Sequence, residues 1–538
     1  MNDNIKDFQL LEQETELLTI KEASIWASEF RGKNVTTSNI SYLITYGKIT
    51  RTEVAGKVFV DKNELIHYYN NHTSKEQAWK DKLGDDLNWT LSFDEYKESD
   101  TTKHVHRLHP YKGKFIPQLV EYFLDSNTDK FKQQVYFKSG DIVYDPFCGS
   151  GTTLVQAHEL GIHAIGNDVS EFNALISNVK VGNYDLHDIE IESKKISDAL
   201  TLLYNQNNLV DFEFELAEEL AIFNKDFFPS PNFKFRLKDK DFDEEKYGSE
   251  KTGLFLQKYK QLLHKYNVNT TPAKDGSFLG KWYLPSIRSE IDLARQFIGK
   301  IQNEQTRKIA TIILSRTIRS CRATTHSDLA TLRDPMTETY YCHKHGRICK
   351  PLYSIISWWN RYSKDTIKRL NHFNELKTNA YQLCLTGDSR SLDITNELSN
   401  KKPQLAELVK KQKIKGIFSS PPYVGLIDYH EQHAYAYDLF GFERKDEMEI
   451  GKMKSGASKK AQEDYVAGIS DVLLNSKKYM VDDYDVFLVA NDKFNLYPEI
   501  AKRSGMQIIN QFKRPVLNRT ERDKAAYSET IFHIKEIK

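Results

Sequence analysis

Residues 141–169 constrain the fold of this chain more than any other stretch. The segment DIVYDPF (141–147) has the pattern of a strand, GTTLVQAHELG (151–161) that of a helix, and HAIGNDV (163–169) that of a second strand. Strand, helix and strand in this order form a βαβ unit. The alternation returns in the segments 381–388, 413–420, 484–492 and 529–535. We therefore expect an α/β fold.

At 538 residues the chain is too long for one hydrophobic core, and we expect roughly two to four domains. A helical, charged stretch from about 185 to 380 interrupts the strand–helix alternation, and the polar segment 74–100 has the composition of a linker. The predicted domains are residues 1–75, 76–185, 186–380 and 381–538. The second and fourth of these form the two halves of the main domain, and the third is an insertion.

The N-terminal unit has a pattern of its own. Thr19 is a predicted helix cap with Glu22 three residues later, and apolar residues follow at helical spacing. A second helix is expected over 36–47 and a hairpin over 48–60, before a last helix capped by Asp61. This order resembles the winged helix-turn-helix of excisionase and MerR-type proteins, which implies contact with DNA. The alternative is a folded appendage used for protein contacts.

Hydrophobic residues make up 39% and aromatic residues 12% of the chain, which excludes an intrinsically disordered protein. No apolar run is long enough for a membrane-spanning helix, and the acidic N-terminus lacks the apolar stretch of a signal peptide. The five cysteines are irregularly spaced, which argues against a disulfide framework and for a reducing compartment. We therefore expect a cytoplasmic protein without membrane contact. The net charge of +1 does not exclude a nucleic-acid partner, because basic residues can gather on one face.

A glycine-rich turn, DPFCGSGTT (145–153), joins the first strand of the βαβ unit to its helix. The two glycines let backbone approach a ligand where a Cβ atom would collide, and the helix N-terminus presents unpaired N–H groups that suit an electron-rich group. Asp168 ends the next strand, where an acidic residue can bind ribose hydroxyls. A dinucleotide fingerprint of the NAD type would need a third glycine, which is missing.

A second candidate site, Ser420-Pro421-Pro422-Tyr423, ends the strand at 413–420. The two prolines stiffen the backbone, so the Ser420 hydroxyl and the Pro421 carbonyl can accept both N–H bonds of an amino group. Tyr423 offers a flat face for stacking. An exocyclic amine held in this way can turn toward tetrahedral geometry and attack a methyl donor, largely through positioning and electrostatics.

The string DPFCGSGTT resembles the first motif of the S-adenosylmethionine-dependent amino-methyltransferases of DNA, and Ser-Pro-Pro-Tyr resembles their fourth motif. The resemblance covers roughly residues 104–180 and 381–535. It implies a Rossmann-like class I methyltransferase sheet with a large, mostly helical insertion and an N-terminal winged helix-turn-helix-like domain. It also implies S-adenosylmethionine as the cofactor and Ser420, Pro421, Pro422 and Tyr423 as the catalytic residues. The cofactor-binding residues that it implies are Lys114, Phe115, Asp145, Pro146, Phe147, Gly149, Ser150, Gly151, Thr152, Asp168 and Asp388.

The same resemblance bears on the target base. Serine before Pro-Pro-Tyr is commoner in family members that methylate the 4-amino group of cytosine and aspartate in those that methylate adenine, although some adenine enzymes carry serine. Cytosine-N4 is therefore the favoured target and adenine-N6 the alternative, and either base must flip out of the duplex. Methylation at cytosine carbon 5 needs a cysteine after proline, and no Pro-Cys pair occurs in the chain. Cys148 fills the variable position of the first motif and is a packing residue.

Basic residues indicate where duplex DNA would bind. Arg316, Arg319 and Arg322 are three residues apart on one predicted helix face, in the insertion that family analogy makes the target-recognition region, and such a face can grip phosphates. Tyr429, shortly after the fourth motif, is a candidate contact to DNA or to the flipped base. A second basic cluster lies in the loop expected before the last strand and consists of Lys513, Arg514, Arg519, Arg522 and Lys524.

The segment 342–349 contains Cys342, His345 and Cys349, which could bind zinc with Cys321 or His326 as a fourth ligand. The spacing is not that of a standard zinc finger, and one ligand would come from afar. We therefore expect no metal here, and instead a loop with buried thiols and a His or Arg that faces DNA.

Two other functions stay open. One is a non-catalytic, sequence-specific DNA-binding regulator that kept the fold, which the intact motifs disfavour. The other is an RNA amino-methyltransferase, although the N-terminal unit and the long insertion favour duplex DNA. A cognate restriction endonuclease is a candidate partner, since the chain itself has no convincing nuclease motif.

Overall fold

The computed structural model describes residues 16–32, 35–45, 49–54, 56–73, 75–111, 113–129, 131–206, 208–273, 275–326, 328, 332–425, 429–452, 455–517 and 526–537. The chain divides into two compact units, one of residues 1–92 with 513–528 and the other of residues 93–512 with 529–538. Within the described residues, each helix is either too short or too polar to cross a membrane.

The smaller unit builds a three-stranded sheet and packs helices around it. The sheet order is β1-β3-β2, with both strand pairs antiparallel. Thr19 caps α1 in a capping box with Glu22, as predicted. The predicted hairpin is also present, and β1, which the sequence analysis missed, pairs with its second strand. The elements are β1 (Leu17–Thr19), α1 (Ile20–Arg31), α2 (Thr37–Thr45), β2 (Thr52–Val54), β3 (Lys57–Asp61) and α3 (Lys62–Thr73).

The segment 74–100, which we expected to be a linker, is partly folded. It contains α4 (Lys75–Leu83), the 3-10 helix η1 (Trp89–Ser92) and α5 (Glu98–Thr101). Trp79 and Trp89 meet edge to face with ring centroids 6.2 Å apart, and Leu91 is fully buried. The charge of the segment concealed these apolar anchors, whose burial stabilises it. The linker prediction was therefore wrong.

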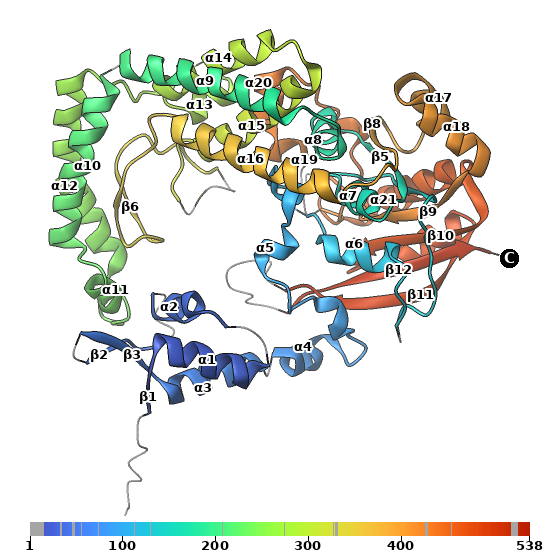
Figure 1. The fold of residues 1–538 in the computed structure, drawn as a ribbon, viewed down its shortest axis with the longest axis horizontal. Coiled ribbons are helices and arrows are strands. Elements are labelled where there is room, and N and C mark those ends of the chain that lie inside the picture. The colour runs from blue at the N-terminus through green and yellow to red at the C-terminus, as the bar shows by residue number, and fades with distance from the viewer. Residues whose placement is uncertain are drawn as a thin grey trace, which may run out of the picture. The chain divides into compact units, whose positions relative to one another are not determined.

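The larger unit is a mixed α/β structure on a seven-stranded, mostly parallel sheet (Figure 1). The strand order is β11-β12-β10-β9-β4-β5-β8. The neighbours from β10 to β8 are parallel, whereas β12 is antiparallel to β10. The strands are β4 (Ile142–Asp145), β5 (His163–Asp168), β8 (Gln382–Thr386), β9 (Ile414–Ser419), β10 (Met480–Ala490), β11 (Met506–Pro515) and β12 (Ser528–Glu536).

Six of these strands confirm the sequence prediction, and β11 was missed. Lys513 and Arg514, which we expected in a loop, lie within β11. The reason is visible in the sequence of this strand, MQIINQFKRP, where polar side chains break the apolar run that marks the other strands.

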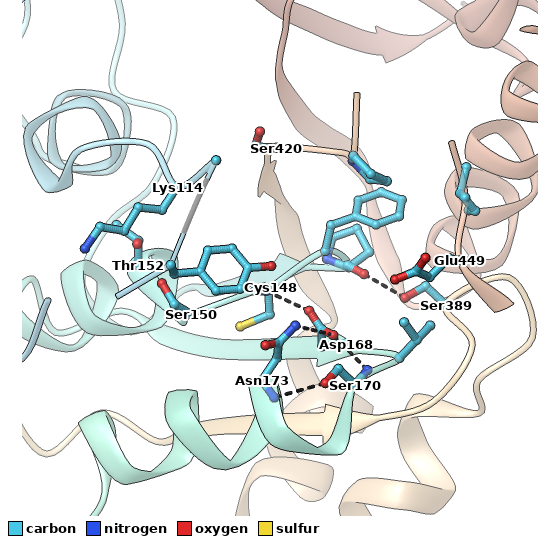
Figure 2. A pocket seen from close by; sticks show the side chains of 18 of the residues that line it. Lys114, Cys148, Ser150, Thr152, Asp168, Ser170, Asn173, Ser389, Ser420 and Glu449 are labelled. Atoms are coloured by element: carbon cyan, nitrogen blue, oxygen red, sulfur yellow. Dashed lines mark hydrogen bonds between the residues drawn. The ribbon is translucent and has the colours of Figure 1, made fainter. Parts of the chain in front are cut away.

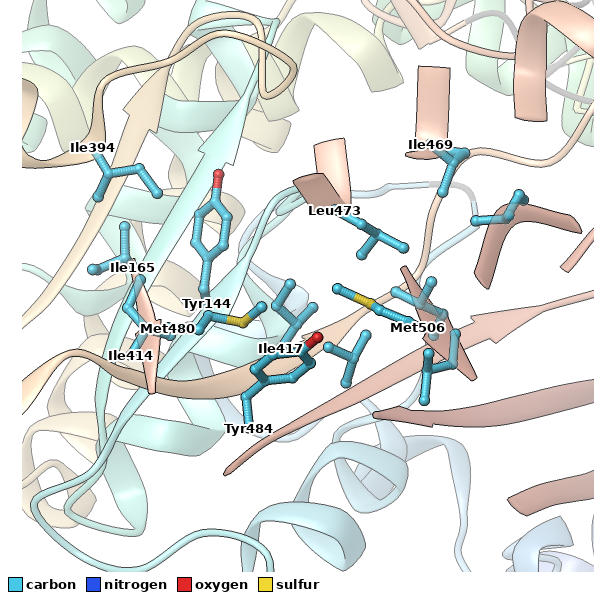
Figure 3. Close-up of a cluster of buried hydrophobic side chains, with 14 of the residues drawn as sticks. Tyr144, Ile165, Ile394, Ile414, Ile417, Ile469, Leu473, Met480, Tyr484 and Met506 are labelled. Carbon is cyan, nitrogen blue, oxygen red and sulfur yellow. The ribbon is translucent and has the colours of Figure 1, made fainter. Parts of the chain in front are cut away.

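Helices pack against the sheet and bury a different core on each of its faces. One core lies under α17, α18, α21 and α22 and includes Tyr144, Ile417 and Tyr484 (Figure 3). On the other face, the ring of Phe418 contacts Phe115 and Phe123. Ile417 and Phe418 enter opposite cores because successive side chains of a strand point to opposite faces. The helices of this part are α6 (Pro117–Leu124), α7 (Thr152–Glu159), α8 (Glu171–Val181), α17 (Ile394–Lys401), α18 (Pro403–Gln412), α19 (Tyr429–Gln432), α20 (Ala434–Phe440), α21 (Lys459–Lys477) and α22 (Tyr497–Arg503), with the 3-10 helices η2 (His104–Arg107) and η3 (Asp446–Met448).

Between α8 and β8 the chain makes a long, mostly helical excursion, coloured green to yellow in Figure 1. A separate hydrophobic core that includes Phe212, Phe255 and Tyr353 holds its outer part together. Its elements are α9 (Leu186–Gln206), α10 (Leu209–Phe227), α11 (Asn232–Arg236), α12 (Glu244–Tyr266), α13 (Phe278–Trp282), α14 (Pro285–Lys300), α15 (Glu304–Ser320), β6 (Tyr340–Cys342), β7 (Arg347–Cys349) and α16 (Ile356–Leu376).

Candidate active site

The carboxyl ends of β4, β5, β8 and β9 meet at one end of the sheet, which is where open parallel sheets bind ligands. A cavity opens there with about 840 Å³ of empty space, part of it open to solvent, which suits a ligand of nucleoside size (Figure 2). Its lining residues are Tyr111, Gly113, Lys114, Phe115, Pro146, Phe147, Cys148, Gly149, Ser150, Thr152, Asp168, Val169, Ser170, Asn173, Asp388, Ser389, Ser420, Pro422, Met448, Glu449 and Ile450.

The glycine turn forms one wall of the cavity and leads into α7. Gly149 and Gly151 have φ of +52° and +77°, a backbone conformation that disfavours any residue with a side chain. A Cβ atom on Gly149 would lie 2.9 Å from the hydroxyl oxygen of Tyr111, and one on Gly151 would lie 2.8 Å from Oγ of Ser177. Both glycines are therefore required by close packing as well as by conformation.

Two buried carboxyl groups support the turn. The Gly149 amide donates to Asp168 Oδ2 (2.9 Å), while the Ser419 hydroxyl donates to Asp145 Oδ1 (2.5 Å). Burial raises the pKa of Asp145 to about 6, although the Ser419 hydroxyl opposes the shift. Burial also raises the pKa of Asp168 to about 6, although the hydrogen bond from the backbone amide of Ser170 opposes the shift. Asp145 lies behind the cavity wall and ties the end of β4 to the end of β9, whereas Asp168 lines the cavity itself.

The segment before β4 also lines the cavity, through Tyr111, Gly113, Lys114 and Phe115. The Lys114 ammonium donates to the His106 carbonyl (2.7 Å), so it is engaged within the protein, and burial lowers its pKa to about 8. The ring of Phe115 packs edge to face on Phe418, with centroids 5.5 Å apart. The side chain of Tyr111 lies against the glycine turn at Gly149.

Asp388 follows β8 and lines the cavity, as its predicted role requires. Its carboxylate accepts from the Arg390 guanidinium at 2.6 to 3.0 Å, which holds the pKa of Asp388 below its usual value despite partial burial. The neighbouring Ser389 hydroxyl donates to the Pro146 carbonyl (2.7 Å) and accepts from the Asn167 amide. These contacts join the end of β8 to the glycine turn.

The serine–proline corner lies in the same cavity as the glycine turn. Ser420 and Pro422 line it, Pro421 is buried, and the Tyr423 hydroxyl donates to Glu529 Oε1 of β12 (2.7 Å). Of the eleven residues predicted to bind a cofactor, nine line this cavity, and Asp145 and Gly151 stand immediately behind it. Segments more than 260 residues apart in the chain thus form one site.

Several lining residues escaped the sequence analysis. Ser170 caps α8, and its hydroxyl is hydrogen-bonded to the Tyr437 hydroxyl (2.6 Å), which in turn contacts His430 Nδ1 (2.5 Å). Glu449 accepts from the amide of His430 (3.2 Å) and lines the cavity. Ser170 had a sequence signal as the polar cap after a strand. Glu449 had none, because it comes from a loop without any motif.

The predicted DNA contacts occupy different environments. Arg316 is buried and paired with Asp365 at 2.6 Å, which favours a structural role. Arg322 is also buried and lies over the ring of Tyr435 (4.8 Å), whereas Arg319 is half-buried. The three arginines therefore do not form an exposed row. Arg519, Arg522 and Lys524 lie outside the described residues, and so does the side chain of Tyr429, whose backbone begins α19.

Comparison with known proteins identifies the family. A family model described as DNA methylase (N6_N4_Mtase) matches residues 12–178. The type II methyltransferase M.MjaII of Methanocaldococcus jannaschii is 47% identical over 527 residues, which cover 96% of this chain and 97% of that protein. The chain belongs to the N6/N4 DNA methylase family. It is therefore a DNA methyltransferase of the kind found in restriction–modification systems.

Two further matches to the DNA methyltransferase were found. The type II methyltransferase M.MvaI of Kocuria varians is 30% identical over 166 residues, which cover 28% of this chain and 34% of that protein. Among solved structures, the rRNA methyltransferase aviRa from Streptomyces viridochromogenes matches with a TM-score of 0.26 and 8% identity, covering 82% of this chain and 94% of that one.

Proposed function

We propose that this DNA methyltransferase transfers a methyl group from S-adenosylmethionine to the exocyclic amino group of a flipped base in duplex DNA, with cytosine-N4 as the target. The observation that supports it is the shared cavity, since Ser420 and the glycine turn line one space. The fold that we infer is the Rossmann-like class I methyltransferase sheet, on which the two motifs meet in this way.

The cavity fits S-adenosylmethionine on grounds independent of the motifs. Ser150 Oγ and Asn173 Oδ1 are buried without a hydrogen-bond partner, and both residues line the cavity. Buried polar atoms rarely stay unsatisfied, so a polar ligand is the natural partner. In this proposal Asp168 would hold ribose hydroxyls and Asp388 the adenine. Gly149 would let the ligand approach the backbone, and Phe115 and Tyr111 would supply apolar contact. When bound, this cofactor supplies an electrophilic methyl group.

The serine–proline corner would hold the target amine. The Ser420 hydroxyl and the Pro421 carbonyl would accept its two N–H bonds, which lets the nitrogen turn toward tetrahedral geometry and withdraws its lone pair from the ring π system. Tyr423 packs against the core and donates its hydroxyl to Glu529, and we infer that its ring supplies the face on which the flipped base stacks. No general base is needed, because the amine can lose its proton after transfer.

The inference about which base is methylated rests on the residue at position 420, a serine. A serine hydroxyl is neutral and accepts one N–H bond, and in the resemblance described above serine accompanies cytosine more often than adenine. Adenine-N6 is the second candidate, since some adenine enzymes share this serine.

DNA would be held by parts outside the cavity. We infer that the smaller unit is a winged helix-turn-helix-like domain that binds DNA, and that the excursion from 186 to 380 is the target-recognition region. The candidate contacts are Arg316, Arg319, Arg322, Arg519, Arg522 and Tyr429. Among them, the ion pair of the buried Arg316 with Asp365 favours a structural role for that residue. M.MjaII is called a type II methyltransferase, and by analogy a restriction endonuclease of the same specificity would be the partner of this enzyme.

A methyl-transfer assay tests the proposal. Purified protein is incubated with radiolabelled S-adenosylmethionine and either duplex DNA or structured RNA, with the Ser420→Ala variant as the control. We expect label in duplex DNA, competition by unlabelled DNA but not by RNA, and almost none with the variant. Transfer to neither substrate would favour the DNA-binding regulator, and preference for RNA would overturn the assignment of the substrate.

A further inference from the structure

Four potential metal ligands gather in the helical excursion, far from the glycine turn in the chain. One ligand atom each of His326, Cys342, His345 and Cys349 lies within 4.8 Å of all the others. The His345 Nδ1 and Cys349 Sγ atoms are 3.4 Å apart, and the His326 Nδ1 and Cys342 Sγ atoms are 3.7 Å apart. In a tetrahedral zinc site with bonds of about 2.0 to 2.3 Å, the ligand atoms lie about 3.3 to 3.8 Å from one another. The cluster therefore has close to the spacing of such a site.

The local fold explains how three of the ligands converge. β6 and β7 form an antiparallel hairpin in which Cys342 faces Arg347. Cys349 is two residues further along β7, so its side chain lies on the same face of the hairpin as that of Cys342. The turn between them has Gly346 at φ +61°, and the Gly346 amide donates to the Cys342 carbonyl (2.7 Å), which brings His345 back toward both sulfurs.

The fourth ligand comes from the segment after α15. His326 is 16 residues before Cys342, and its ring centroid is 4.4 Å from that of His345. The Tyr340 hydroxyl is 2.8 Å from the same His326 Nδ1 atom and would give up this contact when the nitrogen binds the ion. The two cysteines are buried and none of the five cysteines, all of which are described, is in a disulfide.

We propose that His326, Cys342, His345 and Cys349 bind one structural Zn²⁺ ion. The donor set is two thiolates and two imidazoles, which zinc prefers and which neutralises its charge. All four positions are filled by side chains, so the ion would have no open position for chemistry. It would tie the hairpin to the chain that leaves α15, where Arg319 and Arg322 lie. This proposal departs from our expectation of a metal-free loop, because the sequence did not show that His326 meets the hairpin.

Metal analysis of the full chain, purified without a histidine tag, tests the site. We expect elemental mass spectrometry to find about one zinc ion per chain in the wild type, and close to none in Cys342→Ser and His326→Ala. Cys321→Ala is the matched control, since Cys321 is an equally buried cysteine outside the cluster. Zinc-free wild-type protein or full retention of zinc in the two variants would overturn the proposal, as would a disulfide between Cys342 and Cys349.

A second measurement uses wild-type protein, so it holds even if the variants fail to fold. Wild-type protein is stripped with a chelator and titrated with Co²⁺, which should give the thiolate charge-transfer and tetrahedral ligand-field absorption of a two-sulfur, two-nitrogen site, displaced by equimolar Zn²⁺. Stripping should lower the melting temperature while the affinity for S-adenosylhomocysteine is kept, because no ligand of the cluster lines the cofactor cavity. Octahedral cobalt spectra, or no binding, would contradict the site.

Discussion

Replacing Gly149 by alanine distinguishes a specific loss of cofactor affinity from a general loss of stability caused by backbone strain. The left-handed conformation of Gly149 should cost an alanine about 1 to 2 kcal/mol of folding stability. In addition, the new Cβ atom would lie 2.9 to 3.1 Å from three atoms of the Tyr111 side chain, where ordinary contacts begin at 3.4 Å. Tyr111 can retreat in the free protein, whereas in the proposed complex it would have to return to pack on the cofactor. Overpacking of this kind costs about 1 to 3 kcal/mol, so the Kd for S-adenosylhomocysteine should rise roughly 10- to 100-fold.

Gly140→Ala is the matched control for this experiment. Gly140 has φ +91°, and a Cβ atom there meets nothing within 4 Å. The Gly140→Ala variant should lose a similar amount of stability in denaturant unfolding. Its Kd for S-adenosylhomocysteine, measured by calorimetry, should stay close to that of the wild type. If Gly149→Ala bound the ligand as tightly as the wild type, the glycine turn would not be the cofactor cradle. If both variants lost affinity together, the effect would be global strain.

Three further outcomes are expected. Ser420→Ala should lower methyl transfer by about 100- to 1,000-fold at an almost unchanged cofactor Kd, and a matching loss of cofactor affinity would contradict its role. Burial, with the charges of two arginines, lowers the pKa of His433 to about 3. The imidazole of the unfolded chain titrates near 6.5, so the contribution of the neutral, buried His433 to stability is complete above that pH. The free energy of unfolding should fall by about 2 kcal/mol toward pH 5. Urea titrations should show a smaller decline for His433→Gln. Arg316→Ala should destabilise the protein by about 1 to 3 kcal/mol, because Asp365 loses a buried partner, while DNA affinity in filter binding changes little.

The sheet was largely predictable, because its central strands are buried on both faces and therefore appear as continuous apolar runs such as Ile417–Phe418. β11 broke that rule, because polar, exposed side chains such as Gln507, Asn510 and Gln511 interrupt its apolar residues. β1 was missed because three residues carry too little pattern. The folded part of 74–100 depends on single tryptophans whose partners only the tertiary structure supplies.

The site was predictable where chemistry fixes the local sequence. Gly149 and Gly151 are required by backbone geometry, and the two prolines stiffen the chain at Ser420, so both segments form recognisable strings. Glu449 reaches the cavity from a loop, and its position depends on a chain of contacts through His430 that has no local signature. Arg316 shows the opposite limit, because helical spacing alone does not reveal that Asp365 on a neighbouring helix pairs with it.

The central claim is that the cavity joins a methyl donor to an exocyclic amine held at Ser420. Duplex DNA is methylated by the protein with deuterated S-adenosylmethionine and digested, and the nucleosides are analysed by mass spectrometry. We predict a deuterated methyl group on the N4 nitrogen of cytosine. Label on N6 of adenine would keep the amine chemistry and overturn the base assignment, whereas label on carbon 5 of cytosine would contradict the account.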